Sequence, residues 1–91
     1  MRLDKFLKVA RLAKRRSEAH EALDHGRILR DGRPLKPGYR VSPGDILEIH
    51  YANRVVTVRV REVPLRATPA TAAASLYDVL DTKQERPEEW I

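Results

Sequence analysis

Cysteine is absent from this chain of 91 residues, so a disulfide framework and a thiolate metal site are both excluded. Long apolar runs are missing as well, and no segment approaches the about 20 consecutive apolar residues that span a bilayer. The first ten residues lack the apolar core of a signal peptide, because lysine and arginine interrupt them. These absences predict a small cytoplasmic protein that does not enter a membrane.

Groups of side chains typical of catalysis or metal binding are also lacking. His20 and His25 lie about 140° apart around a helix, so they do not share a face as metal ligands would. Ser17 has no evident base to activate it, and Asp31-Gly32 reads as a turn rather than as a glycine-rich phosphate loop. We therefore expect no enzymatic activity, no metal site and no cofactor.

Acidic residues are scarce at the start of the chain, where the first sixteen residues hold seven lysines or arginines and one acid. Residues 1–40 contain 12 basic and 5 acidic residues, a net charge of +7, whereas residues 41–91 contain 6 and 8, a net charge of −2. Because acids usually alternate with bases on a solvated face, this imbalance favours a surface that binds phosphates. Nucleic acid is the expected partner, ahead of an anionic membrane.

Two helices are predicted before Gly26. The apolar residues of the first recur at helical spacing: Leu3, Phe6, Leu7 and Ala10. This spacing predicts a helix over residues 3–10 with one apolar face. Ser17 is expected to cap a second helix over residues 18–25, and Gly26 is typical of a residue that ends a helix.

Beyond Gly26 the pattern becomes extended, and Asp31-Gly32 predicts a tight turn. Alternating apolar residues predict strands over residues 46–51 and 54–63, joined by a hairpin turn. Helices followed by strands indicate an α+β domain, in which two N-terminal helices pack on a small curled antiparallel sheet. We expect this domain to comprise residues 1–63.

The C-terminal segment, residues 64–91, has a different composition. Residues 64–71 are rich in proline and alanine and are typical of a linker. Residues 72–80 are expected to form a short helix that turns Leu76, Tyr77 and Leu80 toward a partner surface, ahead of an acidic tail.

Three motifs together resemble the alpha-L RNA-binding motif, the small domain first named in the fourth small-subunit ribosomal protein. They are RLDKFL at residues 2–7, the basic turn KRRSEA at residues 14–19, and LKPGYRVSPGD at residues 35–45. The resemblance covers about residues 1–63 and implies that the helices and the following loop present a concave basic face to structured RNA. Transferred by position, it implies RNA contacts from Arg2, Lys5, Lys8, Arg11, Lys14, Arg15, Arg16, Ser17, Arg27, Arg30, Lys36 and Arg40.

Among members that lack a catalytic domain, the segments RLDKFLKVARLAKRRSEA and SLYDVL resemble the RqcP family of bacterial ribosome quality-control factors. This resemblance implies binding to a stalled large ribosomal subunit, with contacts to ribosomal RNA (rRNA) and peptidyl-tRNA. It also implies a partner on the same particle, RqcH, and a role in supporting the RqcH-dependent addition of C-terminal alanine tails to the nascent chain. The protein would be ribosome-associated, and a monomer off the ribosome.

Two alternatives stay open from the sequence. The first keeps RNA binding but assigns it to ribosome assembly, or to recycling of the kind carried out by the fifteen-kilodalton heat-shock protein, a relative with a longer basic C-terminal extension. The second is a protein-interaction adaptor whose basic face meets an acidic partner. Copurification of RqcH or of alanine-tailed chains separates the first from quality control, and nuclease-sensitive association with ribosomes argues against the second.

Overall fold

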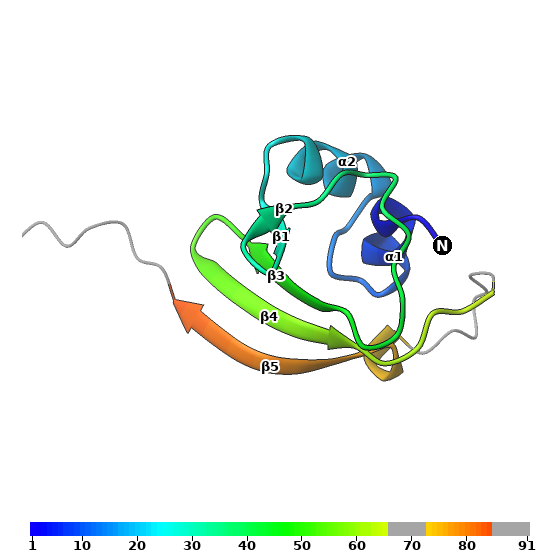
Figure 1. The fold of residues 1–91 in the computed structure, drawn as a ribbon. Helices are drawn as coiled ribbons and strands as arrows, with labels where there is room; N and C mark the ends of the chain where they lie inside the picture. The colour runs from blue at the N-terminus through cyan, green and yellow to red at the C-terminus, as the bar shows by residue number, and fades with distance from the viewer. Residues whose placement is uncertain (66–72, 85–91) are drawn as a thin grey trace, which may run out of the picture.

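The computed structural model describes residues 1–65 and 73–84. Two helices, α1 (Leu3–Val9) and α2 (Arg16–Asp24), precede the strands β1 (Ile28–Arg30), β2 (Arg33–Pro34), β3 (Ile46–His50) and β4 (Arg54–Val60). A single 3₁₀ turn, η1 (Ala73–Ser75), leads into β5 (Tyr77–Gln84). Both helices lie on the concave side of a curled sheet (Figure 1), which confirms the expected α+β class.

The core lies between the helices and the sheet. All four apolar residues predicted for the first helix are at most 2% exposed: Leu3, Phe6, Leu7 and Ala10. The sheet contributes residues that alternate along β3 and β4, with Leu47 and Ile49 paired opposite Val58 and Val56. Period-two alternation therefore places one face of each strand against the helices, as the sequence predicts.

The sheet has the order β2-β1-β3-β4-β5, and every neighbouring pair is antiparallel. The turn between β1 and β2 is the predicted Asp31-Gly32 pair, with φ of 55° and 78°. Positive φ at both central residues suits the twist of a two-residue hairpin, and aspartate and glycine tolerate it better than most residues. The turn prediction is confirmed.

The start of α2 differs from the expectation. The helix begins at Arg16 after the N-cap residue Arg15, and no side chain caps it. Ser17 is therefore an exposed residue of the first helical turn and not the N-cap. The helix ends at Asp24, two residues before Gly26, whose φ of 71° is the left-handed conformation predicted there.

The predicted C-terminal helix is wrong, because residues 77–84 form strand β5 along the free edge of β4. Leu76 is 2% exposed just before the strand, but Leu80 is 47% exposed, so these residues do not share a buried helical face. Val79 pairs with Val58 and Asp81 with Thr57, which leaves Leu80 as the extra residue of a bulge. The unpaired ladder of β4 supplies hydrogen-bond partners that a short isolated helix lacks.

Several expectations lie outside the described residues: most of the linker, Ala72 at the start of the predicted helix, and the acidic tail from residue 85. Within residues 1–65 and 73–84, no helix is long and apolar enough to cross a membrane.

Candidate nucleic-acid interface

A buried carboxylate at the start of α1 gathers two of the predicted RNA-binding arginines. Asp4 is 2% exposed, and its two oxygens lie 3.3 Å from the Arg2 guanidinium and 3.5 Å from that of Arg16. The backbone N–H of Lys5 donates to Asp4 Oδ1 at 2.8 Å, so the carboxylate is held from its own helix as well. Both arginine side chains remain about half exposed, at 45% and 49%. Asp4 therefore holds one terminal nitrogen of each guanidinium while about half of each arginine side chain stays exposed.

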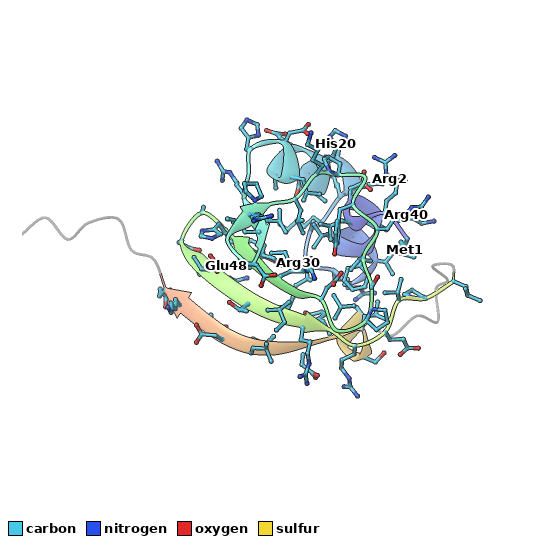
Figure 2. All side chains as sticks on the ribbon, in the orientation of Figure 1. Met1, Arg2, His20, Arg30, Arg40 and Glu48 are labelled. Carbon is cyan, nitrogen blue, oxygen red and sulfur yellow. The ribbon has the colours of Figure 1, made fainter. Side chains whose placement is uncertain are left out.

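The loop before β3 adds a third arginine to this place. The first N–H groups of α1 have no partner within the helix, and those of Leu3 and Asp4 donate to the carbonyls of Tyr39 and Pro37. The same contact pairs Arg2 with Arg40 in an isolated antiparallel bridge. Figure 2 shows Arg2 and Arg40 on the same side of the molecule, beside Met1. We call Arg2 and Arg16, which contact Asp4, and Arg40, which is bridged to Arg2, the N-terminal cluster.

A second buried carboxylate orders Arg30. Asp45, 8% exposed, accepts hydrogen bonds from the Tyr39 hydroxyl and the Ser42 N–H, both at 2.9 Å. The Arg30 guanidinium lies 3.6 Å from its other oxygen. Burial, and then the bond to Asp45, raise the pKa of the Tyr39 hydroxyl above its usual value. This network ties β1 to the loop that carries Arg40.

Three further predicted residues line a hollow elsewhere on the domain. Arg11 and Lys14 come from the α1–α2 loop and Arg27 from the residue before β1, and they border a pocket of about 550 Å³. Tyr51 from the β3–β4 turn and Arg54 at the start of β4 also line the pocket, and the Arg54 guanidinium lies 4.8 Å from the Tyr51 ring centre. None of the three residues of the N-terminal cluster lines it. The residues of the predicted basic face therefore gather at two separate sites, the N-terminal cluster and this pocket.

The other predicted residues are exposed and belong to neither place: Lys5, Lys8, Arg15, Ser17 and Lys36. Sequence reasoning missed Asp4 and Arg54. For Asp4 a signal existed, because it is the one acid among the first sixteen residues and lies two positions from Arg2. For Arg54 none existed, because only the fold brings the β3–β4 turn to the α1–α2 loop.

Comparison with known proteins identifies the domain and the family. A family model for the S4 domain matches residues 1–47. The RQC P-site tRNA stabilizing factor of Bacillus subtilis is 45% identical over 86 residues, which cover 94% of this chain and 96% of that protein. Heat shock protein 15 of Escherichia coli is 33% identical over 88 residues, 97% of this chain but 66% of that longer protein.

The fold has a solved counterpart as well. The trimeric structure of Vibrio cholerae heat shock protein 15 matches with a TM-score of 0.78 at 28% identity, over 87% of this chain and 80% of that one. The likeness extends beyond the S4-domain match and includes most of the sheet. Since the match to the Bacillus subtilis relative spans nearly the whole of both proteins, this chain belongs to the family of RQC P-site tRNA stabilizing factors, a non-enzymatic family of RNA-binding proteins built on the S4 domain.

Proposed function

We propose that this chain acts in bacterial ribosome quality control, where it binds the stalled large ribosomal subunit and steadies the P-site tRNA. Its relatives at 39% to 45% identity are named RQC P-site tRNA stabilizing factors. In the proposed complex the protein contacts rRNA and peptidyl-tRNA through the basic residues predicted from the sequence. The residue contacts and the two RNA partners are our proposal.

The observation that carries this proposal is the N-terminal cluster. Arginine suits phosphate recognition because its planar guanidinium donates several N–H groups in a fixed geometry. Asp4 holds Arg2 and Arg16 before any RNA arrives, so less side-chain entropy is lost on binding. Phosphate contacts of this kind fix position and register on a nucleic acid without reading its sequence. A stabilizing factor requires that property.

The proposed role needs no catalytic residue in this chain. Peptide transfer stays with the ribosome, while the protein neutralises phosphates of RNA strands that would otherwise repel each other. We further propose that it supports RqcH-dependent addition of alanine tails, and that it is a monomer off the ribosome. The recycling role of heat shock protein 15 is less favoured, because that relative extends well beyond the matched region.

Cosedimentation with large ribosomal subunits that carry peptidyl-tRNA tests the proposal. We expect Arg2→Ala combined with Arg16→Ala to weaken association at least about a hundredfold, since two phosphate contacts and their counterion release are lost. The matched control is Arg59→Ala on β4, whose side chain is 53% exposed and also lies against an aspartate, Asp78, at 3.7 Å. Circular dichroism checks that each variant keeps its fold.

Normal association of the double variant, or equal loss in the Arg59→Ala control, contradicts the proposed interface. A second measurement addresses the process itself: alanine-tailed chains and RqcH should copurify with the wild-type protein and be depleted with the double variant. If the wild-type protein binds ribosomes but neither RqcH nor alanine-tailed chains copurify, a role in recycling or assembly is indicated instead.

A further inference from the structure

Two neighbouring hollows share one wall on the concave side of the sheet. The larger, of about 550 Å³, lies between the α1–α2 loop, α2 and the β3–β4 turn. The smaller, of about 270 Å³, opens toward β5 and is lined by Val56, Tyr77, Val79 and Thr82. Four residues border both hollows and form what we call the shared wall: Arg11, Leu12, Tyr51 and Arg54.

The charges around the larger hollow are unbalanced. Arg11, Lys14, Arg27 and Arg54 line it, whereas Glu18 is its one carboxylate. Among residues 1–65 and 73–84, none of these four cations takes part in a salt bridge, in contrast to Arg2, Arg16 and Arg30. Four cations without a carboxylate partner, converging on one hollow, favour an anionic ligand.

The backbone of Arg11 provides an independent observation. Its φ of 60° is the left-handed conformation that commonly ends a helix, here α1, but glycine usually holds that position, and the conformation costs free energy for a residue with a side chain. Neighbouring contacts hold it there: the Arg11 N–H donates to the carbonyl of Lys8 and the Leu12 N–H to that of Leu7. The Tyr51 hydroxyl donates to the Leu12 carbonyl at 2.6 Å and joins the loop to the sheet. The shared wall is therefore built in advance, at a cost in backbone strain.

We propose that a single-stranded RNA segment crosses the shared wall, with a phosphate between Arg11 and Arg54 and a base in the smaller hollow. The smaller hollow offers Val56, Val79 and the half-buried Tyr77 to a base, and its volume suits one base rather than a duplex. The guanidinium of Arg54, already held over the Tyr51 ring, presents a plane on which a base stacks.

This inference rests on the proposed function, because it supplies a second RNA site separate from the N-terminal cluster. Six of the eight residues that line the smaller hollow come from the β3–β4 turn, β4 and β5, beyond residue 47, where the match to the S4-domain family model ends. A protein with two separate RNA sites is suited to hold two RNA strands in a fixed relation.

Fluorescence anisotropy with a short unstructured RNA oligonucleotide tests the site in the full-length chain. We expect Arg54→Gln to weaken binding about tenfold, the effect of a lost stacking contact, and to lower the slope against log salt by about one unit. The matched control is Arg59→Gln, which removes the same charge from the same strand outside both hollows. A photoreactive uridine in the oligonucleotide should crosslink to Tyr51 or Tyr77 in the wild-type protein.

Substitutions at Arg11 separate function from structure. Arg11→Gly relieves the left-handed strain, so it should unfold at a higher temperature than Arg11→Ala, while both lose oligonucleotide affinity alike. Oligonucleotide binding by Arg54→Gln equal to that of the control overturns the inference, as does tighter binding of a polyglutamate peptide than of RNA. If Arg54→Gln fails in this way while the Arg2 and Arg16 variants lose ribosome association, the proposed function stands and only the second site is rejected. If Arg54→Gln loses the oligonucleotide but the Arg2 and Arg16 variants still bind ribosomes, the second site stands and the proposed interface is rejected.

Discussion

The N-terminal cluster and the shared wall both present exposed arginines, but they hold them in different ways. In the cluster, the buried carboxylate of Asp4 fixes Arg2 and Arg16 and neutralises part of their charge. At the shared wall, the backbone conformation of Arg11 and the ring of Tyr51 position the cations, whose charge is left uncompensated. The N-terminal cluster holds its arginines in place but weakens their attraction for phosphate. The shared wall keeps the full positive charge of its cations, which suits a flexible RNA strand. We infer that the cluster sets the register of the protein on rigid RNA.

The largest effect is expected from a substitution in the hydrophobic core, because the N-terminal cluster and the shared wall both depend on that core. Phe6 is 0% exposed and belongs to α1, the helix that carries Asp4 and leads into the Arg11 loop. Phe6→Ala should lower the free energy of unfolding by about 3 to 5 kcal/mol, a large share of what a small domain has. Urea unfolding followed by circular dichroism measures this loss.

Leu65→Ala is the control for this truncation, since that side chain is fully exposed and its removal should leave the midpoint unchanged. Binding at both proposed RNA sites should weaken together in Phe6→Ala. Loss of one site alone would show that the two do not share a scaffold.

A smaller effect is expected from a substitution that tests whether the position of the arginines or the net charge governs RNA binding. Asp4→Asn makes the protein more positive, yet we expect weaker association with large ribosomal subunits because Arg2 and Arg16 lose their anchor. The free energy of unfolding should fall by only about 1 kcal/mol, since both arginines are half exposed and solvated. Binding to the unstructured oligonucleotide at the shared wall should not decrease.

Asp31→Asn is the matched control for Asp4→Asn. It removes the same charge at an exposed turn position, and asparagine tolerates the left-handed backbone there. Cosedimentation of the two variants measures the effect. If Asp4→Asn binds large subunits as tightly as Asp31→Asn, the carboxylate does not position the arginines.

Local patterns in the sequence predict the elements well and their non-local partners poorly. The apolar residues of α1 and the Asp31-Gly32 turn follow from spacing and backbone preference, which neighbouring residues decide. Strand β5 does not, because Leu76, Tyr77 and Leu80 also suit a helix, and only the free edge of β4 favours the strand.

For the candidate site, too, the sequence predicts the local features and not the non-local contacts. Charge imbalance identifies the basic residues of the N-terminal half, and the resemblance to the alpha-L motif implies which of them face RNA. Neither reveals that Asp4 joins Arg2 to Arg16, nor that Arg54 meets the Arg11 loop. Those relations depend on the packing of α1 against α2 and of both on the sheet.

The smallest effect concerns the single hydroxyl that holds the shared wall together. Burial raises the pKa of Tyr51 above its usual 10.0, and its hydroxyl donates to the Leu12 carbonyl. Tyr51→Phe should therefore lower the free energy of unfolding by about 1 kcal/mol at neutral pH. Above pH 10.0 the unfolded tyrosine loses its proton while the folded one keeps it, so this contribution to stability declines as pH rises toward the folded pKa.

Denaturant unfolding of the wild-type and Tyr51→Phe proteins at neutral and alkaline pH measures the difference. The stability gap between them should narrow above pH 10.0, because phenylalanine has no proton to lose and all other titrating groups are common to both. The variant should also bind the oligonucleotide somewhat more weakly while its association with large subunits is unchanged, since the loop at Leu12 is loosened and Asp4 is not. A gap that stays constant with pH, or an equal loss at both RNA sites, would show that this hydroxyl does not hold the shared wall separately from the N-terminal cluster.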